Sequence, residues 1–224
     1  KAGHEMRAPL AAIHSILDAI TQAPNRLSDE QQVLIGRARH RARAMIELVN
    51  DLLKVSRLRD GEEVLKAARV CLGRIVANTV ELMRKRAEGA GLELRCAAGE
   101  VWLDGDEELL RELVTNLVAN AVQYTPPGGR VEVALEETGG QAVLTVADTG
   151  IGIAPADRER IFEEFFRSTA AKETFQNGTG LGLAIVKRIV QVHRGEIRAD
   201  ARDGGGTVFT VRLPAGPPAA PPRT

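Results

Sequence analysis

The residues best suited to chemistry lie in three short motifs in the second half of the chain. In the first motif, residues 112–124, Asn116, Asn120 and Tyr124 are each four positions apart and therefore share one face of a helix. Two amides lined up in this way can ligate a hard cation through oxygen and can hydrogen-bond phosphates or water. A pair of solvated or capping asparagines would give the same pattern, so this helix alone leaves both interpretations open.

The second motif is Asp148-Thr149-Gly150-Ile151-Gly152-Ile153, at the end of a predicted strand. A carboxylate in this position suits a hydrogen bond from an adenine amino group, and the glycines let the backbone approach the base closely. A simple glycine turn is the commoner explanation for an isolated D-x-G-x-G sequence.

The third motif is Asn177-Gly178-Thr179-Gly180-Leu181-Gly182-Leu183-Ala184, in which glycines lead directly into a predicted helix. Backbone N–H groups and the positive end of the helix favour phosphate at such a place. An isolated G-x-G-x-x-G is weak evidence, and this one does not follow a strand, as the dinucleotide-binding fingerprint requires. The context therefore excludes a dehydrogenase.

Two long helices are predicted for the first part of the chain. An apolar stripe at alternating spacings of four and three indicates the first helix, and its members are Met6, Leu10, Ile13, Leu17 and Ile20. A turn over 23–26 ends this helix, and Ser28 is expected to cap a second helix that runs to about Leu58. The apolar stripe of the second helix consists of Met45, Leu48, Leu52 and Val55. Such a helical hairpin can scarcely bury both stripes alone, so we expect a homodimeric four-helix bundle.

The pattern changes after the polar segment 59–63, which is the expected domain boundary. The expected strands are 64–70, 92–96, 101–103, 131–137, 142–147, 197–201 and 208–213, and the expected helices are 72–90, 106–124 and 181–193. These elements predict an α/β sandwich with a mostly antiparallel sheet covered by helices on one face, which makes the whole chain α+β. The predicted organisation is a helical hairpin over 1–60, the sandwich over 64–214 and a Pro-rich disordered tail over 215–224.

The composition excludes several classes of protein. The 224 residues contain 30 Lys plus Arg and 30 Asp plus Glu, and this balance removes the electrostatic basis for general nucleic-acid binding. Cys71 and Cys96 are too few for a disulfide framework and lack metal-ligand spacing, which fits a reducing cytosol. No apolar run approaches the roughly 20 residues of a membrane helix, and no signal peptide is visible. We expect a cytoplasmic fragment, and whether the longer protein is anchored in a membrane stays open.

In this order and spacing, the three motifs resemble the N, G1 and G2 boxes of the histidine kinase, gyrase and Hsp90 ATPase superfamily, whose ATP-binding fold is of the Bergerat type. Residues 160–167, R-I-F-E-E-F-F-R, resemble the F box of histidine kinases in particular, and the resemblance covers roughly 64–213. It implies a catalytic ATP-binding domain in which Asp148 reads adenine and Asn120 holds Mg²⁺. Asn116 would lie beside the metal and the phosphates.

The resemblance also implies a wider set of nucleotide contacts. Tyr124 would pack near the nucleoside, and residues of about 155–178 would form a mobile lid over the phosphates, with Arg167 available to them. The residues that the resemblance assigns to nucleotide binding are Asn116, Asn120, Gln123, Tyr124, Asp148, Gly150, Gly152, Ile153, Arg167, Gly178, Thr179, Gly180, Leu181 and Gly182.

The sequence His4-Glu5-Met6-Arg7-Ala8-Pro9-Leu10 resembles the H box of the same kinases. At roughly 100° per residue, His4 lies on the side of the helix away from the apolar stripe and therefore faces solvent. Pro9 cannot donate to the carbonyl of Glu5, so the helix should bend just after the histidine. If Glu5 hydrogen-bonds one ring nitrogen of His4, the other nitrogen can attack the γ-phosphate. His4, Glu5 and Asn116 are thus the expected catalytic residues.

Two positions depart from the family pattern. Gln123 stands where the family usually has Lys or Arg, so a phosphate contact is missing or is supplied by Arg167 or Lys172. Ala8 stands where many relatives carry Thr or Asn, which positions a water for dephosphorylating the partner. Because alanine has no polar atom for this purpose, kinase activity should survive, whereas phosphatase activity is in doubt.

Other features have simpler explanations. The Phe165-Phe166 pair can be explained as core rather than as part of a functional box. His14, His40 and His193 have no comparable context and are interpreted as structural. The basic run over 37–43 is interpreted as the solvated face of the second helix, with a contact to an acidic partner as the alternative.

The sequence is identified as resembling a two-component sensor histidine kinase, which phosphorylates His4 with ATP and then an aspartate on the receiver domain of a response regulator. One rival is a related ATPase or serine kinase, although such proteins need no helical hairpin with His4 and Glu5. The other is a pseudokinase scaffold, slightly favoured by Gln123 and Ala8. The signal sensed, the identity of the regulator, and transfer within a subunit or across the dimer are not decided by the sequence.

Overall fold

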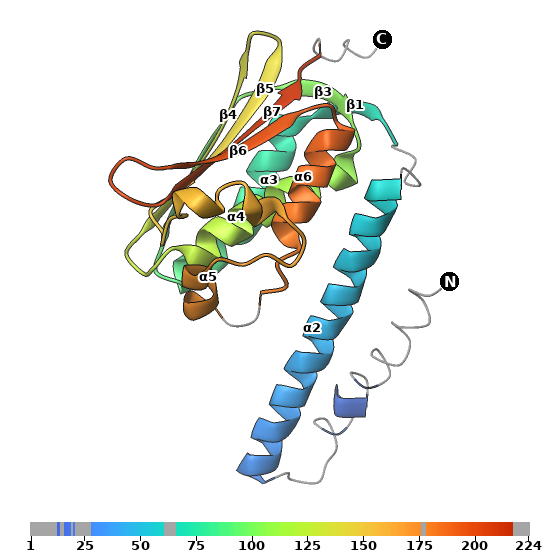
Figure 1. Ribbon diagram of the computed structural model, residues 1–224, viewed down its shortest axis with the longest axis vertical. Coiled ribbons are helices and arrows are strands. Elements are labelled where there is room, and N and C mark those ends of the chain that lie inside the picture. Colours follow the sequence, from blue (N-terminus) through green and yellow to red (C-terminus); the bar gives the residue numbers. More distant parts are fainter. Residues whose placement is uncertain are drawn as a thin grey trace. The chain divides into compact units, whose positions relative to one another are not determined.

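The computed structural model describes residues 13, 16–18, 20, 28–60, 66–175 and 178–216, and the chain divides into two compact units, 1–57 and 58–224 (Figure 1). Of the first predicted helix, the described positions are all helical. The H-box segment 4–10 lies outside the described residues, and so do residues 61–65.

Helix α2, most of which belongs to the first unit, runs from Asp29 to Asp60 and begins where the sequence predicts. Ser28 Oγ accepts a hydrogen bond from the Gln31 N–H at 3.3 Å, and Gln31 Oε1 accepts one from the Ser28 N–H at 3.0 Å. This reciprocal pair is a capping box, so the predicted cap at Ser28 is confirmed. Across the described parts of the chain, no helix combines the length and apolar content that a membrane span requires.

The second unit is built on a five-stranded sheet with the strand order β2-β4-β5-β7-β6. The strands are β2 (Glu93–Ala98), β4 (Arg130–Thr138), β5 (Gln141–Asp148), β6 (Glu196–Ala201) and β7 (Thr207–Pro214). β2 pairs with β4 in parallel, and the other neighbours pair antiparallel, so the predicted mostly antiparallel sheet is confirmed. A separate two-stranded sheet pairs β1 (Ala68–Cys71) with β3 (Trp102–Gly105).

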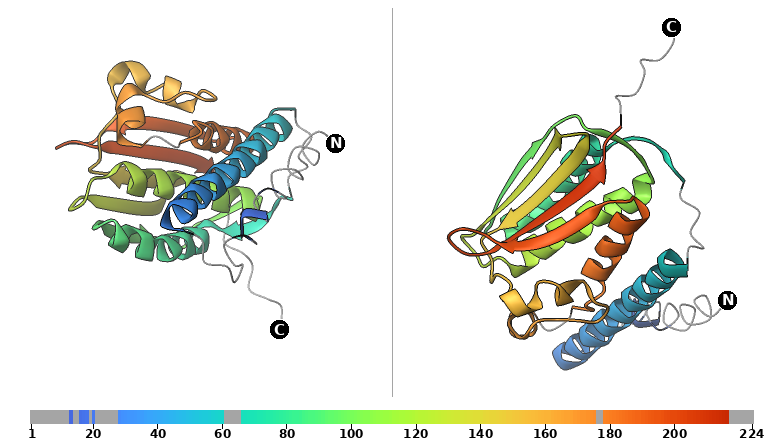
Figure 2. Two further views of the ribbon diagram at one scale, coloured as in Figure 1. Left: turned by 90° about the horizontal axis from the view of Figure 1, so that it is seen from below. Right: turned by 45° about the horizontal axis from the view of Figure 1, so that its top comes forward.

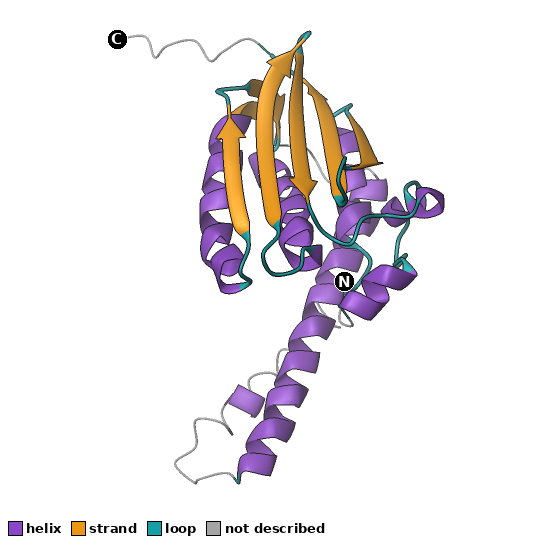
Figure 3. Ribbon diagram, turned by 90° about the vertical axis from the view of Figure 1, so that its left-hand side faces the viewer, coloured by secondary structure: helices purple, strands orange, loops and turns teal. Residues whose placement is uncertain are grey.

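Helices α3 (Leu72–Gly89), α4 (Glu107–Tyr124) and α6 (Gly182–Val192) cover one face of the five-stranded sheet (Figures 2 and 3). α4 contacts both α3 and α6 and so occupies the middle of this layer. The apolar faces of the helices meet the inward side chains of the strands, and fully buried members of this core include Leu110, Leu113, Leu117, Leu144, Ile185 and Ile189. The α/β sandwich predicted from the sequence is therefore confirmed.

The hairpin that joins β4 to β5 sets the register of the central strands. Gly139 and Gly140 form its two-residue turn with φ values of 60° and 73°, as a type I′ turn requires. The register pairs Thr138 with Gln141 at the turn and Val131 with Asp148 at the far end. Asp148 is thereby placed at the end of the sheet away from the hairpin.

Short elements occupy the segment between β5 and α6 that was predicted as a lid. They are the 3₁₀ turns η1 (Pro155–Asp157) and η2 (Arg160–Phe162) and the helix α5 (Thr169–Thr174). Phe162 is buried and packs edge-to-face on Phe209, with 6.4 Å between ring centroids. Phe165 is 54% exposed, so the interpretation of the Phe165-Phe166 pair as core is wrong for Phe165. The buried aromatic residue of this segment is Phe162.

The buried carboxylate of Asp106 caps the helix that carries the asparagines. Asp106 Oδ1 accepts from the N–H groups of Glu108 at 3.0 Å and Leu109 at 3.2 Å, and Oδ2 accepts from the Lys66 N–H at 3.1 Å. The Asp106 N–H donates to His193 Nε2 at 3.1 Å, and His193 Nδ1 lies 2.8 Å from the carbonyl oxygen of Ile189. Both ring nitrogens of His193 are therefore engaged inside the protein, which supports its structural interpretation.

We expect Asp106→Ala to lower the free energy of unfolding by about 1–2 kcal/mol, because the N–H groups at the start of α4 would lose their acceptor. Asp106→Asn is the matched control, since asparagine caps a helix about as well as aspartate. Urea unfolding followed by circular dichroism measures the difference. An alanine variant as stable as the wild type would show that the cap contributes nothing.

Candidate nucleotide-binding site

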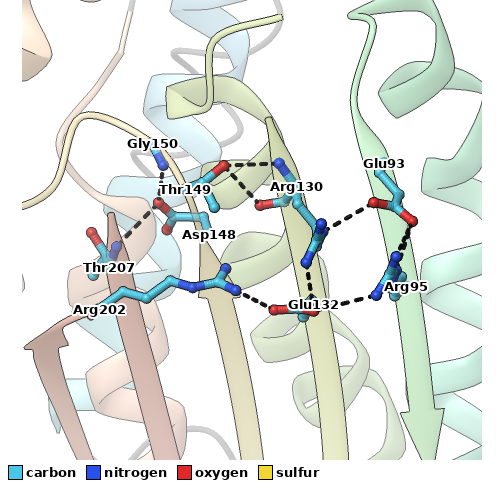
Figure 4. Close-up of polar contacts among 9 residues, drawn as sticks. All are labelled: Glu93, Arg95, Arg130, Glu132, Asp148, Thr149, Gly150, Arg202 and Thr207. Carbon is cyan, nitrogen blue, oxygen red and sulfur yellow. Dashed lines mark hydrogen bonds and ion pairs between the residues drawn. The ribbon is translucent and has the colours of Figure 1, made fainter. Parts of the chain in front are cut away.

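The candidate site lies where the end of β5, the C-terminal end of α4 and the turn between β6 and β7 meet. Asp148, the last residue of β5, is only 4% exposed. Its Oδ1 accepts hydrogen bonds from the Gly150 N–H at 2.8 Å and the Thr207 N–H at 3.2 Å (Figure 4). Within the described part of the chain, no hydrogen bond to its other oxygen, Oδ2, is formed, which leaves that oxygen to accept from a ligand.

The surroundings of Asp148 shift its pKa by two opposing effects. Burial raises the pKa of the Asp148 carboxyl above its ordinary value, because a low-dielectric site disfavours the charged form. The N–H bonds from Gly150 and Thr207 and the positive charge of Arg202 oppose this rise in pKa. As the pH falls, Asp148 therefore takes up a proton at a higher pH than an ordinary aspartate does.

Two glycines let three segments of backbone meet at Asp148. A Cβ atom on Gly150 would lie 2.4 Å from the carbonyl oxygen of Tyr124, and the Ile151 N–H donates to that same oxygen at 3.1 Å. A Cβ atom on Gly206 would lie 2.0 Å from the carbonyl oxygen of Asp148, and Gly206 has a φ of 104°. Side chains at these positions would push the end of α4 and the β6–β7 turn away from the carboxylate.

The polar face of α4 lies beside the start of α6. Asn116, Asn120, Gln123 and Tyr124 are all half-buried, whereas the core face of the same helix is fully buried. The side-chain oxygen of Asn116 lies 3.2 Å from the position of a Cβ atom on Gly182. The first and third sequence motifs therefore meet at Asn116, while none of the described side-chain hydrogen bonds involves Asn120.

The glycine-rich motif also contacts the segment predicted as a lid. Gly180 has a φ of 73°, and a Cβ atom there would lie 2.8 Å from the backbone of Phe165, whose N–H donates to the Gly180 carbonyl at 3.0 Å. Thr179 Oγ1 accepts from the N–H of the buried Leu181 at 3.3 Å, which turns the chain into α6. These bonds fix the backbone of the motif at the start of the helix.

The guanidinium of Arg167 lies next to this motif. Its Cζ is 3.2 Å from the position of a Cβ atom on Gly178, and its Nη2 donates to the carbonyl oxygen of Ala171 at 3.0 Å and to that of Phe175. Gly152, with a φ of 70°, and Ile153 continue the backbone after the second motif and are half-buried. Lys172, the other cation considered for the place of Gln123, is exposed on α5.

The structure adds residues that the motif analysis missed. Thr207 supplies a backbone donor to Asp148, Gly206 packs on its backbone, and Arg202 adds positive charge nearby. The available signal was the run Gly204-Gly205-Gly206 before the last strand, which marks a turn of unusual backbone conformation. The predicted residues His4, Glu5 and Asn177 lie outside the described part of the chain.

The donor set of α4 fits a magnesium ion that is held mainly by phosphate. Within the described residues, no group of three or more His, Cys, Asp or Glu side chains could hold a metal. Asn116 and Asn120 supply neutral amide oxygens, and Mg²⁺ usually keeps several waters and binds substrate phosphates besides one or two protein oxygens. A nucleotide-borne Mg²⁺ is therefore compatible with the side chains present.

Two family models match separate parts of the chain and leave residues 62–104 between them unmatched. Residues 1–61 match the His Kinase A (phospho-acceptor) domain, and residues 105–217 match the histidine kinase-, DNA gyrase B- and HSP90-like ATPase. The sensor histidine kinase RppB of Synechocystis is 38% identical over 95% of this chain and 47% of its own length. The sensor-like histidine kinase SenX3 of Mycobacterium tuberculosis is 34% identical over 95% of this chain and 52% of its own. The chain thus spans about half the length of these curated relatives.

Solved structures agree with the sequence matches. Full-length ShkA, crystallised in complex with AMPPNP, superposes with a TM-score of 0.81 and 31% identity over 98% of this chain and 46% of its own. The mycobacterial sensor histidine kinase MprB superposes with a TM-score of 0.58 and 35% identity over 67% of this chain and 99% of its own.

Proposed function

This chain belongs to the two-component sensor histidine kinases, and on that premise we propose that it transfers the γ-phosphoryl group of ATP to its own His4. The observation that carries the proposal is the buried carboxylate of Asp148, held by two backbone N–H groups at the end of the sheet. An isolated aspartate of this kind suits recognition of an amino group on a base. The adjoining glycine-rich turn into α6 suits recognition of phosphates.

In the proposed site, the adenine amino group donates to Asp148, and the absence of a side chain at Gly150 lets the end of α4 pack against the segment that holds this carboxylate. The N–H groups at the start of α6 face the phosphates, and Asn116 lies beside them. Asn120 would hold Mg²⁺, with Asn116 beside it, and the bound ion would neutralise phosphate charge and orient the γ-phosphoryl group. Arg167, whose guanidinium lies against Gly178, takes the phosphate contact that Gln123 does not make.

Transfer then depends mainly on position and electrostatics. Glu5 accepts a hydrogen bond from one ring nitrogen of His4, and the other nitrogen attacks the γ-phosphorus. A nitrogen–phosphorus bond forms as the bond to the bridging oxygen breaks, and ADP leaves with the electron pair. The segment 59–63 is the proposed hinge for bringing the bound nucleotide to His4.

We further propose that the chain acts as a homodimer and passes the phosphoryl group from His4 to an aspartate on a response-regulator receiver domain. α2 presents apolar side chains that a single chain leaves uncovered, with Met45 52% and Leu52 42% exposed. Burying such a stripe against a second copy would complete a four-helix bundle. A molar mass of two chains in light scattering is the expected result.

The function is tested by incubating the chain with Mg·ATP that carries the label on either the γ- or the α-phosphate. We expect label on the protein from γ-labelled ATP alone, and we expect it to be lost in acid and retained in alkali. A serine kinase of the same superfamily would give acid-stable label. A scaffold without chemistry would give no label, and either outcome would refute the proposal.

Ala8 leads to a prediction about the reverse reaction. In the helix predicted from the sequence, position 8 would lie one turn beyond His4 on roughly the same face, and alanine can neither donate to nor accept from a water there. We expect little phosphatase activity toward the phosphorylated regulator, and Ala8→Thr should raise it several-fold. The measurement is the decay of purified phospho-regulator with wild type, with Ala8→Thr and with no kinase. Rapid decay with the wild type would show that another group orients the water.

A further inference from the structure

The turn between β6 and β7 determines how Asp148 is held. Arg202 begins this turn, where its N–H donates to the Gly206 carbonyl at 3.2 Å and its own carbonyl accepts from the Gly205 N–H at 3.0 Å. Gly206 then packs on the backbone of Asp148, and Thr207 donates to the Asp148 carboxylate. Any shift of the turn therefore changes the hydrogen bonding of this carboxylate.

The side chain of Arg202 connects the turn between β6 and β7 to strand β4 of the sheet. It crosses β5 and reaches β4, where its Nη2 donates to Glu132 Oε2 (Figure 4). The side chain is 20% exposed, and its Nη1 is buried with no hydrogen-bond partner among the described atoms. Among the described side chains, Glu132 forms the ion pair with Arg202, and Glu132 is shared with Arg130 and Arg95.

Glu132 belongs to a row of ion pairs across β4 and β2. Its Oε1 lies 3.7 Å from Arg130 Nη1 and 3.9 Å from Arg95 Nη1, and both arginines also pair with Glu93. This row fixes the position of Glu132 and hence the anchor of Arg202. These exposed ion pairs contribute little to the free energy of folding. Their effect is to restrict the position of the Glu132 side chain.

We propose that Arg202 is a positioning residue of the nucleotide site: anchored on Glu132, it holds the turn 202–207 against Asp148 and adds positive charge beside the carboxylate. This inference rests on the proposed recognition of adenine by Asp148, and Arg202 is a further residue on which that recognition depends. Arg202 is not proposed to contact the nucleotide. It acts through Asp148.

Arg202 is the charged side chain that acts on the pKa of Asp148. Burial raises the pKa of Asp148, and Arg202 is the charged side chain that lowers it. On β4, Arg130 is engaged by Glu93 and Glu132 and offers its backbone N–H to Thr149 Oγ1 at 2.8 Å. From α4, Tyr124 contributes its backbone carbonyl to Ile151. Loss of Arg202 should therefore raise the pKa of Asp148 further and shift its protonation to higher pH.

The experiment compares ATP with inosine triphosphate, which carries a carbonyl where ATP carries the exocyclic amino group. Calorimetry with Mg²⁺ near neutral pH, in a His4→Gln background that prevents turnover, gives both dissociation constants. We expect Arg202→Gln to reduce the preference for ATP by about tenfold, the size of one charge-assisted hydrogen bond. Affinity for inosine triphosphate should change much less, because no amino group is read there.

Two further variants keep the result independent of folding defects. Arg202→Lys retains the charge and should keep most of the preference for ATP, whereas Glu132→Gln removes the anchor and should cause a smaller loss in the same direction. Arg198→Gln is the matched control, because Arg198 lies in an exposed ion pair with Glu196 on the same hairpin. It should behave as the wild type.

A pH series supplies the readout that a purely structural role would not change. The pH at which ATP affinity falls on acidification should be higher in Arg202→Gln than in the wild type, and the shift should vanish when Asp148→Asn is also present. Equal losses for both nucleotides, or an unchanged preference, would overturn the role of Arg202. If Asp148→Asn alone leaves the preference unchanged, the proposed adenine reading itself fails, and the inference fails with it.

Discussion

Replacing His4 with glutamine is expected to reduce autophosphorylation to background while leaving ATP affinity at the wild-type value. Glutamine has no imidazole nitrogen that can attack phosphorus, so the acceptor is lost. The nucleotide site proposed for 64–214 contains none of the H-box residues, so binding should persist. Transfer of label from γ-labelled ATP and calorimetry with a non-hydrolysable ATP analogue measure the two quantities on the same preparation.

His40→Gln is the matched control, since it removes an exposed histidine of α2 outside the proposed site. It should label like the wild type. Label that persists in His4→Gln and moves to His14 or His40 would assign the acceptor elsewhere. A loss of ATP binding together with labelling would mean that the substitution acts on folding.

Asp148→Asn is expected to weaken ATP binding by about 1.5–3 kcal/mol, which corresponds to a loss of roughly ten- to 150-fold. Asparagine keeps the size of the side chain but replaces a charged acceptor with a neutral amide. The N–H groups of Gly150 and Thr207, which now bond the charged Oδ1, would bond a weaker acceptor or face an amide N–H₂ group. Both changes disfavour the adenine amino group as donor, and calorimetry measures the loss.

The control for this variant is Asp200→Asn on β6, which removes the same charge from an exposed position of the same unit. Its ATP affinity should equal that of the wild type. Unchanged ATP affinity in Asp148→Asn would show that the base is recognised elsewhere. The melting temperature of each variant separates recognition from stability.

Elements with strong local signals could be predicted well from the sequence. The capping box at Ser28 places the start of α2, and the buried positions of α4 follow its apolar spacing. The Gly139-Gly140 turn is predictable because both residues need a positive φ in a two-residue hairpin. In each of these cases a few residues that are close in sequence determine the local structure, so the sequence alone is sufficient to predict it.

Contacts between distant segments could not be predicted in this way. Thr207 lies 59 positions from Asp148, and Arg202 lies 70 positions from Glu132, so both contacts depend on the strand order of the sheet. The parallel pairing of β2 with β4 brings together the side chains that form the row of ion pairs around Glu132. No local sequence pattern indicates this pairing. Phe165 is exposed although it is apolar, and its N–H donates to the Gly180 carbonyl, a contact between segments that its residue type does not indicate.

The most direct test of the central claim is to locate the phosphate. Wild-type chain is incubated with Mg·ATP, digested at neutral to alkaline pH and analysed by mass spectrometry of its phosphopeptides. The account predicts phosphate on the peptide that contains His4, lost after brief treatment with acid and absent from His4→Gln. Acid-stable phosphate on a serine or threonine, or hydrolysis of ATP with no phosphate on the protein, would contradict it.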